Sequence, residues 1–142
     1  MKEVIKTDKA PAAVGPYSQA IKFGNTLYTA GQVPIDPATG KVADCDLSSQ
    51  IDPATGKVSE CSISTQAKQC LKNLEGVITS AGFAMTDVVK VTVFITDMAD
   101  FPLVNEEYKK FFQEPYPARS CVGVASLPLG VRVEMEAIAV KN

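Results

Sequence analysis

The chain has 142 residues, of which 46% are hydrophobic and 21% charged, and its 14 Lys and Arg against 16 Asp and Glu give a net charge of -2. This is the length of one ordinary domain, so we expect a single domain over residues 1–142. The sequence contains no histidine, which excludes Ser-His-Asp and Cys-His nucleophile pairs, imidazole-based ribonuclease chemistry and histidine-containing zinc sites. Without an excess of basic residues, tight binding to bulk nucleic acid is not expected.

The sequence also predicts the cellular compartment of the protein. No apolar run approaches the roughly 18 residues of a membrane-spanning helix, and the N-terminal residues lack the apolar core of a signal peptide. We therefore predict a cytoplasmic protein without membrane association. The four cysteines, Cys45, Cys61, Cys70 and Cys121, include no Cys-x-x-Cys pair. Because a chain of this length does not need disulfides for stability, free thiols are predicted.

The N-terminal part predicts β-structure. Short apolar stretches at 2–6 and 19–23 flank a turn that contains Gly15 and Pro16, and a further strand is expected at 27–31. These stretches indicate an opening β-hairpin.

The middle of the chain predicts a long helix. From Ile63 to Ala81 apolar residues recur at helical spacing, with Ser62 as the expected N-cap and Gly82 as the expected stop. The following segment, 88–96, is rich in β-branched residues and apolar on both faces, which favours a central strand covered on both sides.

A second helix and two strands complete the pattern. Asp100 is expected to cap the helix, and 119–125 and 131–140 are expected to be strands. The apolar face of this helix is made by Phe101, Val104, Tyr108, Phe111 and Phe112. The order β-β-β-α-β-α-β-β predicts an α+β fold in which one mixed sheet carries both helices on one face. The other face then needs a cover, for which a partner subunit is the natural candidate.

One segment is duplicated in tandem. IDPATGKVADCDLSSQ (35–50) is followed at once by IDPATGKVSECSISTQ (51–66), identical at 11 of 16 positions. Two copies are too few for a solenoid, so we predict a lengthened surface loop before the first helix. A calcium site built on its acidic residues is the alternative, but their spacing fits no EF-hand loop and we predict no metal. These residues are Asp36, Asp44, Asp46, Asp52 and Glu60.

Few residues carry a signal for chemistry. The sequence has no dinucleotide-binding, phosphate-binding, serine-hydrolase or zinc-deaminase motif. Arg119, which opens one expected strand, and Glu134, inside the next, could face a common cleft. The competing interpretation is an ordinary half-exposed strand in which charged and apolar residues alternate.

Three other polar residues are ambiguous by themselves. Cys121 is either a buried structural cysteine or a nucleophile that the nearby Arg119 would have to activate. Tyr17 and Asn105 could wall or orient a small ligand, although a tyrosine after Gly-Pro more often packs its ring on the sheet.

Six segments together resemble one known family. They are APAAVGPYSQAI (10–21), GQVPIDPATG (31–40), QAKQCLKNLEGVI (66–78), VVKVTVFITDMADFPLVNEEY (88–108), YPARSCVGVASLP (116–128) and VEMEAIAV (133–140). This set is similar to the RidA (YjgF) family of reactive-intermediate deaminases, also labelled L-PSP-type endoribonucleases. Only the duplicated loop falls outside the resemblance.

The resemblance implies a chorismate-mutase-like subunit in a homotrimer whose sheets form a central barrel with clefts between subunits. It implies hydrolysis of 2-iminobutanoate or 2-iminopropanoate to the 2-oxo acid and ammonia, with no cofactor. Arg119 would hold the substrate carboxylate. Glu134 would orient and polarise water, as general base or proton relay, aided by the backbone carbonyl of Cys121.

Tyr17, Gly31 and Asn105 match further positions of the family's site. One position departs, because Ala30 stands where many members have serine. The lost hydroxyl is expected either to weaken binding by about 1 kcal/mol, through one missing hydrogen bond, or to shift the substrate preference. Two alternative functions stay open at this stage. One is an endoribonuclease that inhibits translation, and the other is a trimer that binds 2-oxo acids without turnover.

Overall fold

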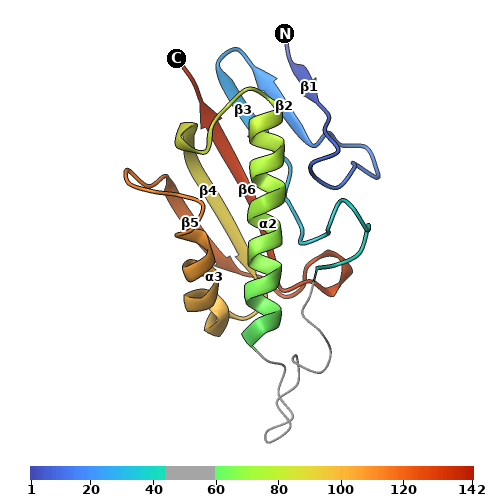
Figure 1. Cartoon of the computed structure of the whole chain (residues 1–142), viewed down its shortest axis with the longest axis vertical. Coiled ribbons are helices and arrows are strands. Elements are labelled where there is room, and N and C mark those ends of the chain that lie inside the picture. The colour runs from blue at the N-terminus through green and yellow to red at the C-terminus, as the bar shows by residue number, and fades with distance from the viewer. Residues whose placement is uncertain (44–59) are drawn as a thin grey trace, which may run out of the picture.

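The computed structural model describes residues 1–43 and 60–142. In this part of the chain a six-stranded sheet carries both helices on one face (Figure 1). The strands are β1 (Glu3–Ile5), β2 (Ala20–Phe23), β3 (Thr26–Thr29), β4 (Val88–Ile95), β5 (Ala118–Gly123) and β6 (Val133–Val140). The helices are α2 (Glu60–Ser80) and α3 (Phe101–Tyr108). The predicted α+β class, with both helices on one face, is confirmed.

The sheet is mixed, with the strand order β1-β2-β3-β6-β4-β5. Every neighbouring pair is antiparallel except β4 and β5, which are parallel. A parallel pair needs a crossover, and α3 supplies it. The segment predicted as a central strand, β4, is internal as expected, although β6 lies nearer the middle. β5 forms one edge of the sheet.

The core lies between the sheet and the helices. Along β6, buried Val133, Met135 and Ala137 alternate with half-buried Glu134 and Glu136, as expected for a strand with one covered face. The apolar stripe of α2 packs against the covered face and is fully buried. Its members are Ile63, Ala67, Cys70, Leu71, Leu74, Val77 and Ile78.

The boundaries of α2 differ from the prediction at one end only. The helix begins at Glu60, so Ser62 is a buried residue of its first turn and not the N-cap. The C-terminal end is as predicted: Gly82 has φ 86°, and the Phe83 and Gly82 amides donate to the carbonyls of Ile78 and Thr79, a Schellman motif.

The second helix is shorter than its apolar pattern predicts. It ends at Tyr108, so Phe111 and Phe112 follow it in the chain. Asp100 occupies the N-cap position but its side chain makes no capping bond. Its two carboxylate oxygens instead accept from Arg132 Nη2, at 2.9 and 2.8 Å. The Asp100 side chain, predicted to cap α3, thus pairs with Arg132, which lies far away in the sequence.

The described residues of the duplicated segment lie at its two ends. Residues 35–43 form a turn closed by a bridge between Ile35 and Val42, and residues 60–66 are the first turns of α2, which corrects the loop prediction for that part. Residues 44–59 lie outside the described residues, and so do most of the proposed calcium ligands. The two described pieces supply the first nine and the last seven positions of the repeat, which together make one complete unit.

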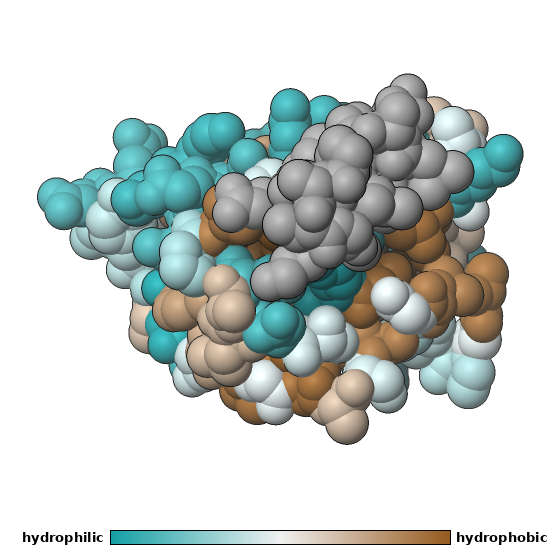
Figure 2. Space-filling model, turned by 90° about the horizontal axis from the view of Figure 1, so that it is seen from below, coloured by the Kyte–Doolittle hydropathy of each residue, from teal (hydrophilic) through white to brown (hydrophobic). Residues whose placement is uncertain are grey.

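The sheet face away from the helices is open in the single chain. It displays Tyr28 of β3 and Val122 of β5, which are 50% and 43% exposed, beside Glu134, Glu136 and Ile138 of β6. Apolar patches also interrupt the polar surface at the end of the molecule where α2 begins (Figure 2).

Two further predictions can be compared with the described residues. Cys70 and Cys121 are free thiols, as predicted, whereas the side chains of Cys45 and Cys61 are outside the described set. Within the same ranges, no helix has the length and hydrophobicity needed to cross a membrane.

Candidate functional site

Arg119 lies on the helix-bearing face of β5, in a hollow of about 350 Å³. Its Nη1 donates to Asn105 Oδ1 at 2.7 Å. The guanidinium carbon stands 5.0 Å from the ring centre of Phe101 and 4.7 Å from that of Tyr108. Three side chains of α3, spaced i, i+4 and i+7, therefore hold one arginine of β5.

The charge of Arg119 has no carboxylate partner among the described residues. Arg132 shows the contrast, because Asp100 neutralises it at 2.8 Å. A half-buried guanidinium that is held by a neutral amide and two ring faces keeps its attraction for an incoming anion. The hollow beside Arg119 is therefore suited to a small carboxylate.

Cys121 follows Arg119 on the same face of β5 and packs partly against the core. Burial raises the pKa of its thiol, and the nearby Arg119 only lowers it in part. A raised pKa opposes formation of the nucleophilic thiolate, which favours the structural interpretation. The Val124 amide donates to the carbonyl of Ile95 in β4. Because the backbone groups of successive strand residues point to alternate sides, the N–H and C=O of Cys121, three residues earlier, point away from β4 to the unpaired edge of the sheet.

Glu134 and Gly31 form a second group, on the open face. A Cβ on residue 31 would collide with Glu134 Oε1, so Gly31 leaves room for this carboxyl group in its observed position. Gln32 exchanges backbone hydrogen bonds with Met135 and fixes the approach of the two segments. Ala30 precedes Gly31, and its amide donates to the Gln19 carbonyl at 2.8 Å.

Two details define the surroundings of Glu134. Burial, and then the neighbouring carboxylate of Glu136, raise the pKa of Glu134 above its ordinary value. Thr29 does not supply a hydroxyl in place of the missing serine at position 30, because it is buried and accepts from the Ala137 amide at 3.0 Å.

The structure does not bring Arg119 and Glu134 together within one chain. Arg119 lies on the helix face, whereas Glu134 lies on the open face. Arg119 is in register with Val91 of β4, but Glu134 is in register with Phe94, three residues along. The two positions are thus about 10 Å apart along the strands and about 10 Å apart across them. The interpretation of one common cleft is wrong for a single subunit.

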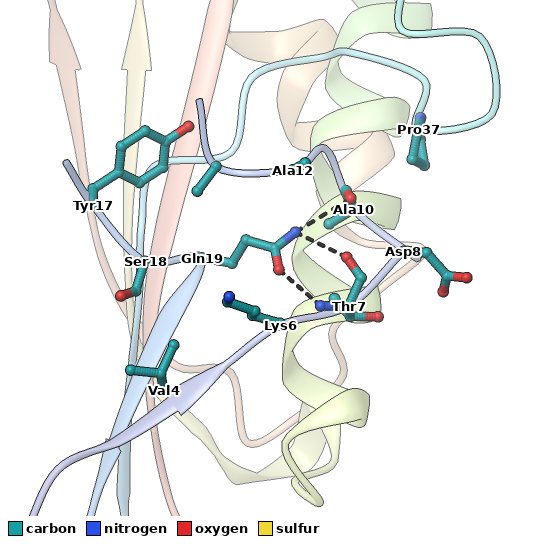
Figure 3. Close-up of a pocket in the computed structure, with 11 residues that line it drawn as sticks. Val4, Lys6, Thr7, Asp8, Ala10, Ala12, Tyr17, Ser18, Gln19 and Pro37 are labelled. Carbon is teal, nitrogen blue, oxygen red and sulfur yellow. Dashed lines mark hydrogen bonds between the residues drawn. The ribbon is translucent and has the colours of Figure 1, made fainter. Parts of the chain in front are cut away.

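Tyr17 lines a separate hollow, of about 600 Å³, formed by the N-terminal loop (Figure 3). Buried Gln19 organises this loop: its Oε1 accepts from the Thr7 amide, and its Nε2 donates to the carbonyls of Thr7, Ala10 and Pro11. The Tyr17 ring is 52% exposed. It is therefore free to form the wall of a larger cleft.

Sequence reasoning missed the residues that support the site. The apolar pattern places Phe101 and Tyr108 on the buried face of the helix, but both rings also flank Arg119. The i, i+4, i+7 spacing of Phe101, Asn105 and Tyr108 was the available signal. No group of three or more metal-ligating side chains occurs in the parts of the chain that the structure describes.

The comparisons with known proteins agree with these observations. A family model described as Endoribonuclease L-PSP matches residues 7–141. A RutC family protein of Pyrococcus horikoshii is 46% identical over 142 residues, which is 100% of both chains. The crystal structure of the YjgF gene product of Escherichia coli gives a TM-score of 0.83 at 41% identity and covers 99% of each chain.

A further relative has a name that states an activity and a crystal structure that contains a ligand. TdcF of Escherichia coli carries the name of a reactive intermediate deaminase and is 42% identical, over 100% of this chain and 99% of its own. Its crystal structure with bound serine gives a TM-score of 0.83 and covers 99% of each chain. The matching family model and the full-length identities show that this chain belongs to the RidA (YjgF) family, whose model bears the Endoribonuclease L-PSP description.

Proposed function

We propose that this protein hydrolyses 2-imino acids such as 2-iminobutanoate and 2-iminopropanoate to 2-oxo acids and ammonia, without a cofactor. The observation that carries the proposal is the uncompensated guanidinium of Arg119 in its hollow. Both substrates carry a carboxylate next to the reacting carbon. The serine bound to TdcF has the same arrangement of carboxylate and α-nitrogen, which supports a ligand of this class.

In the proposed reaction Arg119 holds the carboxylate through charge-assisted hydrogen bonds and so fixes the C=N carbon. Glu134 takes a proton from water as the oxygen attacks that carbon. Attack on the protonated imine gives a neutral carbinolamine. Glu134 then returns the proton to the carbinolamine nitrogen, the C–N bond breaks and ammonia leaves, and the hydroxyl loses its proton to water to form the C=O of the 2-oxo acid. The raised pKa of Glu134 brings its basicity closer to neutral pH, where a general base is most effective.

Because Arg119 and Glu134 lie on opposite faces, we place each site between two subunits of a homotrimer. One subunit would contribute Arg119, Asn105 and the Cys121 carbonyl. The next would contribute Glu134 with Gly31 and Ala30, and the exposed Tyr17 would wall the cleft. The open sheet face, with exposed Tyr28 and Val122, supports such an assembly because it leaves apolar surface to cover.

Subunit complementation tests both the chemistry and the shared site. Arg119→Ala and Glu134→Gln are each expected to abolish accelerated decay of 2-iminobutanoate generated in situ by an amino-acid oxidase. After the two inactive variants are unfolded together and refolded in equal amounts, about a quarter of the sites of a cyclic trimer would receive both native residues. Activity should therefore return to about a quarter of the native level.

Three controls complete the experiment. Each variant refolded alone should remain inactive, and the native chain carried through the same procedure sets the full level. No recovery in the mixture would contradict the shared site. Saturable binding of 2-oxobutanoate by the native protein, without any effect on imine decay, would instead indicate a binding protein and contradict the deaminase proposal.

A further inference from the structure

α3 presents one stripe of side chains to Arg119. Phe101 and Tyr108 offer ring faces at 5.0 and 4.7 Å from the guanidinium carbon, and Asn105 accepts from Nη1 at 2.7 Å. These contacts use a single N–H of the five that a guanidinium carries. The guanidinium keeps its positive charge, and its remaining N–H donors stay available to a ligand.

The hydrogen-bond acceptor that α3 offers to Arg119 is the side-chain amide of Asn105, which carries no charge. A carboxylate in the place of Asn105 would form a charge-assisted pair with Arg119, as Asp100 does with Arg132. Such a pair would compete with the carboxylate of a substrate. The amide orients the guanidinium in the same way but leaves its charge uncompensated.

Tyr108 adds a second neutral contact. Burial raises the pKa of its hydroxyl to about 12, so no phenolate charge forms beside Arg119 near neutral pH. The hydroxyl itself is buried and has no hydrogen-bond partner among the described residues. What Tyr108 supplies to Arg119 is therefore its ring, which also packs at 4.6 Å against Phe112.

We propose that Asn105, Phe101 and Tyr108 are positioning residues that hold Arg119 as a preformed carboxylate receptor by orienting its guanidinium without neutralising it. This rests on the proposed function and deepens it. Asn105 thereby acts through Arg119 and not on the substrate. The neutrality of the residue at position 105 is a determinant of substrate affinity.

The decisive variant is Asn105→Asp, which keeps the shape of the side chain and adds one negative charge. Arg119 binds the carboxylate in both ground and transition states, so the expected result is a KM for 2-iminobutanoate raised at least tenfold with kcat within about threefold of native. The Kd of 2-oxobutanoate, measured by calorimetry, should rise by a similar factor. Damage to the fold would lower kcat instead.

Two further comparisons separate position from general disruption. Asn25→Asp makes the same chemical change in an exposed turn between β2 and β3 and should leave KM unchanged. Tyr108→Leu removes the ring and should raise KM at least fivefold relative to Tyr108→Phe, which keeps it. Equal values for the two Tyr108 variants would overturn the role of the ring.

A native KM and Kd in Asn105→Asp would overturn the proposal. The binding measurement also separates it from the proposed reaction. If the native protein binds 2-oxobutanoate but does not accelerate imine decay, the deaminase function fails while the Kd of Asn105→Asp still tests the receptor. If the native protein neither binds nor turns over, both fail.

Discussion

Glu134 shows how one residue acquires a function from its surroundings. In the sequence it is one of three charged residues that alternate with apolar ones in a strand. In the structure its carboxyl group lies over Gly31, where a Cβ would collide with the carboxyl group in its observed position. Burial and the like charge of Glu136 together oppose its ionisation. These conditions suit a general base that works near neutral pH.

A pH profile of turnover tests this environment. The base must be ionised, so activity should fall as the pH drops through the raised pKa of Glu134. Glu136→Gln removes the like charge, which lowers the pKa of Glu134, and the acid limb of kcat/KM should therefore move to lower pH. The measurement is the enzyme-dependent rate of imine decay between about pH 5 and 9.

The matched control is Glu75→Gln, on the exposed side of α2, where the same change should not move the limb. A limb that stays in place in Glu136→Gln, or moves to higher pH, would show that Glu136 does not set the basicity of Glu134.

At the scale of elements, the two helices differ in how well their sequence predicts them. α2 carries a long apolar stripe and a glycine in the left-handed region at its end, and both are local signals. α3 continues its apolar pattern into Phe111 and Phe112, which follow the helix in the chain. Capping is a local interaction, so the sequence predicts Asp100 as the cap of α3. In the structure Asp100 binds Arg132 instead, and no local pattern predicts this pairing because Arg132 lies 32 positions later in the chain.

The turn at 35–43 is held by a residue of α2. Asn73, fully buried, donates to the carbonyls of Val33 and Ile35 at 3.0 and 2.8 Å and accepts from Gln69. Asp36 closes the turn by accepting from the amides of Ala38, Thr39 and Gly40. The first copy of the repeat thus makes specific contacts with the core.

Removal of residues 44–59 tests whether one repeat unit suffices. The shortened chain joins Ala43 to Glu60 and keeps one complete unit, including every residue that makes the contacts of the turn and of α2 described above. It should fold with a free energy of unfolding equal to that of the native chain or up to about 1 kcal/mol higher, because a shorter loop costs less closure entropy. Urea denaturation followed by circular dichroism measures the difference.

The same shortened protein should retain imine turnover, because none of the proposed site residues is removed. A loss of more than about 2 kcal/mol would show that the second unit contributes contacts of its own. Normal stability with lost turnover would assign it a part in the site.

At the scale of the molecule, the open face of the sheet decides whether the proposed sites can form. Ile138 lies at its centre, paired with Tyr28 of β3 and Lys90 of β4. Ile138→Glu would place a charge where we expect a second subunit, at a large desolvation cost. The expected result is a folded single chain, by light scattering after size-exclusion chromatography, that no longer accelerates imine decay.

Lys72→Glu, on the exposed side of α2, makes the net charge more negative by two units where Ile138→Glu makes it more negative by one. It is therefore a stringent control for added negative charge and should keep the native assembly and turnover. If Ile138→Glu assembles like the native protein, the open face is not the subunit interface. If it dissociates but stays active, the site does not need two subunits.

The sequence by itself determined the α+β class, the order of the elements, the C-terminal end of α2 and the identity of Arg119 and Glu134 as candidates. These follow from local periodicity, from turn chemistry and from family motifs. Only the tertiary structure decided that Arg119 and Glu134 lie on opposite faces, that α3 holds Arg119 with neutral partners, and that Asp100 pairs with Arg132. The reason is physical: strand order, register and partner choice are set by contacts between residues far apart in the chain, which no local pattern encodes.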